Sequence, residues 1–143
     1  MGGYLGSHLN QVDEKGRVTL PAAFRRETDG DSFVLIQVHA DALTLYPDEK
    51  WKDVERRMRE HLQRAPGRRH EFLALTANAR EVVPDKQGRI LIPERLRSAV
   101  GLEGEALMIG ALDKIEIWDP TRFEGTVGET PGDLGEVAGR LFA

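Results

Sequence analysis

The stretch VDEKGRVTLPAAFR, Val12 to Arg25, has a second version in the same chain, PDKQGRILIPERLR, Pro84 to Arg97. Both versions keep an Asp, a Gly-Arg pair, two branched apolar residues around one variable position, a Pro and a final Arg. Residues 13–47 align with residues 85–119 without a gap, with seven identical pairs and with apolar character kept at six further pairs. Two such units are too few for a solenoid, so the pattern indicates a duplicated half-domain.

Each half is predicted to contain a strand, a turn, a strand, a short helix and two further strands. Asp at the first position and Gly at the last position favour tight turns at residues 13–16 and 85–88. Alternating apolar residues then predict the short strands RVTL and RILI, and a Pro suits the first turn of each following helix. Because each half has only about 40 residues, a size that rarely folds alone, we expect both halves to share one core.

Between and after the halves lie segments of different character. Residues 48–80 carry apolar residues at helical spacing, beginning with Trp51, and predict a helical insertion. Residues 121–143 form an acidic tail with two short apolar helix faces. The predicted organisation is a first half at 1–47, the insertion at 48–80, a second half at 81–120 and the tail at 121–143.

Composition excludes several classes of protein. The chain has 143 residues and no cysteine, which rules out a disulfide scaffold, a thiol nucleophile and a cysteine zinc site. No apolar run approaches the length of a membrane span, and the first residues lack the features of a secretory signal, so a cytoplasmic protein without membrane partners is expected. The four histidines are scattered, no enzyme fingerprint appears, and neither a metal, a cofactor nor a catalytic residue is predicted.

Each repeated phrase carries a local charge of +2, over residues 13–26 and 85–97, although the net charge of the chain is −4. Each turn is expected to present its arginine at the rim of the sheet, where a guanidinium can bond a guanine or a phosphate. The plainer alternative is that each arginine only forms an ion pair with the Asp of its own turn. The candidate DNA contacts are Lys15, Arg17, Arg25, Lys86, Arg89 and Arg97, and the candidate turn-forming and orienting residues are Asp13, Gly16, Asp85 and Gly88.

The segments YLGSHLNQVDEKGRVTLPAAFRRE and EVVPDKQGRILIPERLR resemble the MraZ family of bacterial transcriptional regulators. The motif that carries the resemblance is Asp-x-x-x-Arg, present once in each half as Asp13…Arg17 and Asp85…Arg89. The resemblance implies an α+β, mainly β fold. In it, two SpoVT/AbrB-like halves share a small barrel-like core with peripheral helices. It also implies a ring-shaped homo-oligomer that binds guanine-rich direct repeats in double-stranded DNA upstream of the division and cell-wall gene cluster, at the nucleoid.

Two other functions stay open at this point. An enzyme is disfavoured because the carboxylates lie beside Lys or Arg, which hold them ionised and make them poor general acids. A structural or protein-binding oligomer, of the antitoxin-like type and without DNA readout, is the second alternative. The helix around Trp51 could then contact a partner or a neighbouring protomer, or it could simply cover the core.

Overall fold

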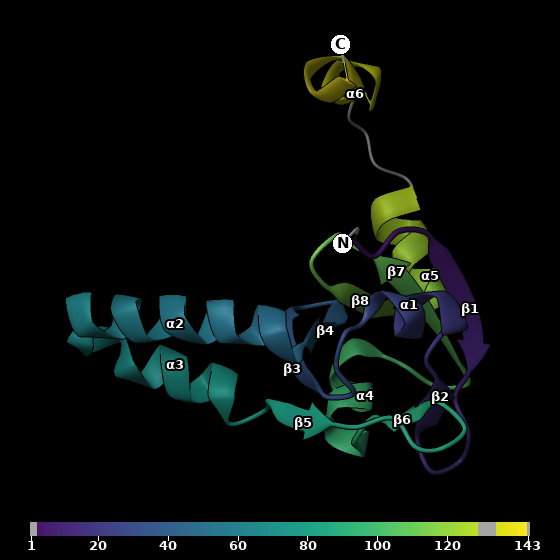
Figure 1. Ribbon diagram of the computed structural model, residues 1–143, viewed down its shortest axis with the longest axis horizontal. Coiled ribbons are helices and arrows are strands. Elements are labelled where there is room, and N and C mark those ends of the chain that lie inside the picture. The colour runs from purple at the N-terminus through teal and green to yellow at the C-terminus, as the bar shows by residue number, and fades with distance from the viewer. Residues whose placement is uncertain (1–2, 129–133, 143) are drawn as a thin grey trace.

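The computed structural model describes residues 3–128 and 134–142. Its elements follow one another in the order that the duplicated pattern predicts, with a helical hairpin between the halves and helices after them (Figure 1). The first half contains β1 (Ser7–Gln11), β2 (Arg17–Thr19), α1 (Ala22–Glu27), β3 (Phe33–His39) and β4 (Ala42–Pro47). The insertion contains α2 (Asp48–Arg64), the 3₁₀ turn η1 (Pro66–Arg68) and α3 (Arg69–Thr76). The second half contains β5 (Arg80–Val82), β6 (Arg89–Leu91), α4 (Glu94–Val100), β7 (Glu105–Gly110) and β8 (Ile115–Trp118). The tail contains α5 (Pro120–Phe123), the π-helical turn η2 (Glu124–Gly128) and α6 (Leu134–Phe142).

The two halves exchange strands. A six-stranded sheet has the order β1-β7-β8-β4-β3-β5, and β2 pairs with β6 in a separate two-stranded ribbon. Thus β1 of the first half pairs with β7 of the second, and β5 of the second half pairs with β3 of the first, in each case antiparallel. The fold is α+β with two pseudo-symmetric halves, as predicted, whereas closure of the sheets into a barrel stays a prediction.

One core serves both halves. Equivalent apolar positions of the two copies are buried in a single cluster, which explains why the apolar pattern is kept in both. The buried equivalent pairs are Val18 and Ile90, Leu20 and Ile92, Phe24 and Leu96, Leu43 and Ile115, and Leu45 and Ile117. Burying each of these side chains contributes about 1.5–3 kcal/mol relative to leaving it exposed. Each half needs the apolar side chains of the other half to bury its own.

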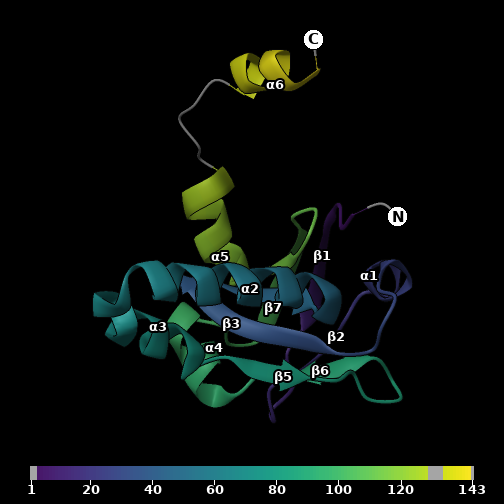
Figure 2. The same ribbon diagram turned by 60° about the vertical axis from the view of Figure 1, so that its left-hand side comes forward.

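The insertion projects from this core as a helical hairpin. Figures 1 and 2 show α2 and α3 side by side, extending away from the sheets. The first turn of α2 is held near the sheet, where Trp51 packs on Tyr46 of β4 and Lys50 pairs with Asp113 at 3.8 Å. Neither α2 nor α3, both described in full, has a buried side chain.

The tail is helical where it is described. Asp119 caps α5 by accepting a hydrogen bond from the backbone N–H of Arg122 at 3.1 Å, and Arg122 also pairs with Asp41 at 3.6 Å. Two acids of the predicted acidic tail, Glu129 and Asp133, lie outside the described residues. No helix in the described ranges is long and apolar enough to cross a membrane.

Candidate nucleic-acid interface

The two repeated phrases meet in the β2–β6 ribbon. Arg17 lies opposite Leu91, Val18 opposite Ile90, and Thr19 opposite Arg89. Because side chains alternate across a strand, Val18 and Ile90 enter the core and the other four side chains share the outward face. We call this outward face, formed by Arg17, Thr19, Arg89 and Leu91, the ribbon face.

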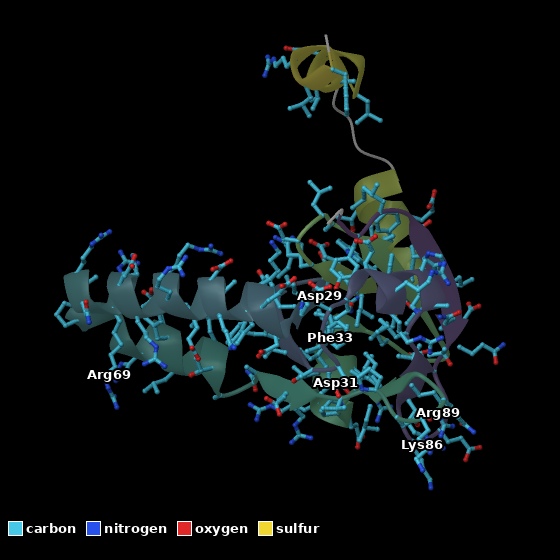
Figure 3. The ribbon with its side chains drawn as sticks, viewed as in Figure 1. Asp29, Asp31, Phe33, Arg69, Lys86 and Arg89 are labelled. Carbon is cyan, nitrogen blue, oxygen red and sulfur yellow. The ribbon has the colours of Figure 1, made fainter. Side chains whose placement is uncertain are left out.

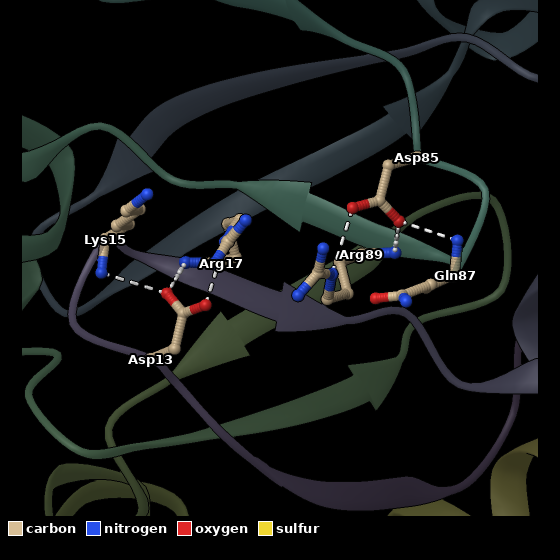
Figure 4. A network of polar contacts seen from close by, with 6 residues as sticks. All are labelled: Asp13, Lys15, Arg17, Asp85, Gln87 and Arg89. Atoms are coloured by element: carbon tan, nitrogen blue, oxygen red, sulfur yellow. Dashed lines mark hydrogen bonds and ion pairs between the residues drawn. The ribbon is translucent and has the colours of Figure 1, made fainter.

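Each ribbon strand is preceded by a tight turn. In the first turn the backbone N–H of Gly16 donates to the carbonyl of Asp13 at 3.0 Å, and Gly16 has a φ of 89°. In the second turn Gly88 donates to the carbonyl of Asp85 at 2.9 Å, with a φ of 80°. A positive φ of this kind favours glycine, so the Gly of each phrase is required by the backbone. Because the strands are antiparallel, the two turns lie at opposite ends of the ribbon (Figure 4).

The Asp of each turn fixes the Arg that follows. Asp13 Oδ1 accepts hydrogen bonds from the backbone N–H of Lys15 at 3.0 Å and of Arg17 at 2.8 Å. Its other oxygen, Oδ2, accepts one from Arg17 Nε at 2.8 Å. Asp85 repeats this set with Gln87 N–H at 2.8 Å, Arg89 N–H at 3.0 Å and Arg89 Nε at 2.9 Å. Both arginines therefore lie over the ribbon, between the two turns (Figure 4).

The ion pair leaves the far end of each guanidinium unused. Among the described residues, only the Nε of Arg17 and of Arg89 bonds a carboxylate, and no hydrogen bond uses their Nη atoms. The side chains are 35% and 29% exposed. An Arg that is held by its Nε, with its Nη donors unused and its side chain partly exposed, can bond another group, so the ion pair and an external contact are compatible.

These hydrogen bonds lower the pKa of both turn carboxyls. The backbone N–H of Arg17 is the largest cause for Asp13, and the backbone N–H of Arg89 is the largest cause for Asp85. Partial desolvation opposes them without reversing the direction. A lowered pKa in the folded state stabilises the fold above the unfolded pKa, and that contribution is lost as the pH falls through the folded pKa. At neutral pH both carboxylates are ionised and both arginines are held.

The pKa shifts can be measured directly. In a carboxyl-carbon NMR titration of the native chain, the midpoints of Asp13 and Asp85 should lie below the ordinary value of 3.8. In the denatured chain both should return to about 3.9, because the turn hydrogen bonds are gone. Native midpoints at or above those of the denatured chain would show that the Asp–Arg turns do not form in solution.

The remaining predicted residues lie around the turns. Lys15 and Lys86 are exposed on the turn tips. Arg25 lies on α1 and Arg97 on α4, and each reaches the turn of the other half. Arg97 donates from Nε to the carbonyl of Ile92 at 2.8 Å and packs over Gly16, whereas the Arg25 guanidinium lies against Gly88.

Two members of the ribbon face were missed at the sequence level. Thr19 and Leu91 are both exposed. Leu91 is 48% exposed although it is a large apolar residue. The signal was present, because both occupy the variable position between two apolar residues and therefore had to point outward. The backbone carbonyl of Thr19 accepts a hydrogen bond from Asn10 Nδ2 at 2.7 Å, which holds this residue in place.

A cavity of about 430 Å³ adjoins the second turn. Arg25 and Lys86 contribute positive charge to its walls, and Asp31 and Asp85 contribute negative charge. Figure 3 shows Lys86 and Arg89 together at one end of the molecule, with Arg69 on the helical hairpin at the other. No cluster of His, Cys, Asp or Glu suited to a metal ion occurs within residues 3–128 and 134–142.

Comparison with known proteins gives one consistent family. A family model described as "MraZ protein, putative antitoxin-like" matches residues 4–72 and 75–132. A protein of Cutibacterium acnes named "Transcriptional regulator MraZ" is 37% identical over 121 residues, covering 85% of this chain and 84% of the relative. A protein of Acetivibrio thermocellus with the same name is 36% identical over 138 residues, covering 96% of both chains. These relatives are named as regulators and not as enzymes.

Proposed function

Because this chain belongs to the MraZ family, we propose that it is a sequence-specific DNA-binding transcriptional regulator whose β2–β6 ribbon contacts the DNA. The observation that carries the proposal is the ribbon face, on which two arginines are held by carboxylates while their Nη ends stay available. The proposed place of action is the nucleoid in the cytoplasm.

The shape of the ribbon suits the major groove. That groove is about 12 Å wide and admits a two-stranded β-ribbon. The two Nη groups of an arginine can donate together to O6 and N7 of one guanine, which is the commonest specific contact of this kind. With two such arginines per chain, guanine-rich sites are the expected targets.

The surrounding cations have supporting roles in the proposal. Lys15 and Lys86 on the turn tips would neutralise phosphates on either side of the groove. Arg25 and Arg97 would hold the opposite turns in place and present their remaining donors to phosphate. Since the two turns have nearly equivalent geometry and each carries one lysine, we propose that both halves contact DNA.

Repeated copies would supply the affinity. One ribbon offers few contacts, and the chain as a whole is acidic, with a net charge of −4. A ring of identical chains would bind direct repeats with several ribbons at once, and linked contacts bind far more tightly than one alone. The proposed targets are the short guanine-rich direct repeats upstream of the division and cell-wall gene cluster.

Fluorescence anisotropy with two duplexes tests the proposal. The native chain should bind a guanine-rich direct-repeat duplex more tightly than a scrambled duplex of the same composition. Affinity should fall steeply with salt, with a log–log slope of about −0.9 for each phosphate neutralised. Equal binding of both duplexes would contradict sequence readout, and no binding of either would favour a protein-binding module.

A further inference from the structure

The described part of the chain carries two apolar surfaces that the core does not use. One is a groove between α2 and α3, and the other is one face of α6. The groove has a volume of about 280 Å³ and is lined mainly by apolar side chains. Its apolar walls are formed by Trp51, Met58, Leu62, Phe72 and Leu73.

The groove is a surface of the hairpin and not an extension of the core. No residue of α2 or α3 is buried, although their apolar residues follow helical spacing, and Leu73 is 46% exposed. An exposed apolar surface that is rimmed by polar residues is typical of an interaction site or a binding groove. A groove between two helices accepts an amphipathic helix, whose apolar residues lie three or four positions apart.

Helix α6 has the matching form. Its apolar residues Leu134, Val137 and Leu141 recur at that spacing, and Phe142 extends the same surface. Leu134 is 73%, Leu141 72% and Phe142 84% exposed, and α6 stands apart from the sheets in both ribbon views (Figures 1 and 2). A helix of nine residues with glycines at 135 and 139 is marginal alone in water, so it needs a surface to pack against.

The charges around the two surfaces are complementary. Residues 56–70, at the far part of the hairpin, include six arginines and a single acid, Glu60. Some of these arginines pair with acids nearby, but Arg57, Arg64 and Arg69 have no ion pair among the described residues. Residues 123–139 contain four acids and no Lys or Arg. Arg59 and Arg69 line the groove together with Glu55, which pairs with Arg59. The unpaired Arg69 therefore suits the acidic sequence that leads into α6.

The strand register separates the two surfaces within one chain. Strands β4 and β8 are antiparallel, with Ala42 opposite Trp118 and Leu45 opposite Ile115. Because α2 follows β4 and α5 follows β8, the hairpin and the tail leave the sheet from opposite ends. The contacts agree, since α2 pairs with Asp113 before β8 while α5 pairs with Asp41 before β4.

We propose that α6 of one copy of this chain docks in the α2–α3 groove of a neighbouring copy. Leu134, Leu141 and Phe142 would pack against Met58, Leu62 and Phe72, and Arg69 would lie beside the docked helix. The proposal rests on the self-association included in the proposed function and identifies the surfaces that make it. Each chain offers one groove and one helix, so the contact is head-to-tail and generates a closed ring when its rotation closes.

Disulfide cross-linking between differently tagged chains tests this contact. The chain has no cysteine, so single substitutions introduce unique thiols. Native-length chains carrying Leu141→Cys and Leu62→Cys, one with a larger tag, are mixed and oxidised. A covalent heterodimer of intermediate size is the expected product. As the matched control, Leu141→Cys is mixed with a chain carrying Val38→Cys, at a site 53% exposed on β3 outside the groove, and no heterodimer should form.

Three results would overturn the proposal. The first is that Leu141→Cys forms no heterodimer with Leu62→Cys, and the second is that it forms as much heterodimer with Val38→Cys. The third is that a chain carrying both Leu62→Cys and Leu141→Cys forms only an intramolecular disulfide. Light scattering and anisotropy on the native chain are run alongside. A native oligomer that binds the repeats but gives no cross-link would remove this contact and leave the proposed function standing. A native monomer that does not bind the repeats would remove the proposed function itself.

Discussion

Replacing Arg17 by Ala should remove most of the DNA affinity while leaving the mass of the protein in solution unchanged. Within the fold the guanidinium of Arg17 bonds only through Nε, to Asp13. The substitution therefore removes the Nη donors that would bond the DNA and leaves the core intact. A bidentate Arg–guanine contact is worth about 1–3 kcal/mol, and each chain of an oligomer would lose one such contact. Anisotropy with the direct-repeat duplex measures the affinity, and light scattering measures the mass.

The control for this variant is Lys52→Ala. Lys52 lies on α2, is 71% exposed and pairs with Asp48, so its replacement removes the same charge far from the ribbon face and outside the α2–α3 groove. Its DNA affinity should stay close to that of the native chain. If Arg17→Ala instead lowers the mass of the oligomer, or if both variants lose DNA binding equally, then Arg17 has a structural or purely electrostatic role and the proposed readout is wrong.

Replacing Gly16 by Ala should destabilise the whole protein. The φ of 89° costs an L-residue about 1–2 kcal/mol. A Cβ at this position would also lie 2.6 Å from the carbonyl oxygen of Ile92 and 2.6 Å from Arg97 Nε. Because that carbonyl directly follows the opposite ribbon strand, and the N–H of Ile92 donates to the carbonyl of Gly16, relief requires this close approach to open, at a further cost of about 1–3 kcal/mol. Each kcal/mol lowers the thermal midpoint by about 4 °C in a chain of this size.

A second glycine provides the control. Gly30 has no atom within 4 Å of a Cβ built on it, outside its chain neighbours, so Gly30→Ala should leave the midpoint nearly unchanged. Differential scanning calorimetry of the two variants gives the comparison. Equal midpoints for Gly16→Ala and Gly30→Ala would mean that the close contact between the first turn and the opposite strand does not exist in solution.

The duplicated phrase predicted the local structure because its signals are local. Asp and Gly define each turn, alternation defines each ribbon strand, and the Pro directly precedes each short helix, at Pro21 and Pro93. The shared core also followed, since halves of this size cannot bury an apolar face alone. These conclusions needed only residues that are close in the chain.

Contacts between the halves could not be predicted in the same way. The packing of Arg97 on Gly16 and of Arg25 on Gly88 joins residues far apart in sequence. In the sequence these arginines look like exposed helix residues, equivalent to any other cation near a turn. The antiparallel pairing of β2 with β6 brings the helix of each half to the turn of the other half. Neither phrase alone predicts that pairing.

The division of the chain into four segments remains our proposal. Strand β4 ends at Pro47 and α5 begins at Pro120, close to the proposed borders. Strand β5 begins at Arg80, whereas the proposed second half begins at residue 81. The helical spacing of apolar residues predicted the insertion. It did not predict that the insertion would project from the core, because the same spacing occurs in helices that cover a core and in helices that bind a partner.

Photo-cross-linking shows directly whether the ribbon face contacts DNA. Thr19→Cys, modified with a photoreactive group, places the probe opposite Arg89 and two residues from Arg17, in a chain with no other cysteine. The same probe at Lys52→Cys, on α2 and outside the α2–α3 groove, is the control. We expect the Thr19 probe to cross-link to the direct-repeat duplex and the Lys52 probe not to do so. Cross-linking from Lys52 with none from Thr19 would contradict DNA binding by the ribbon, because the DNA would then lie along the hairpin.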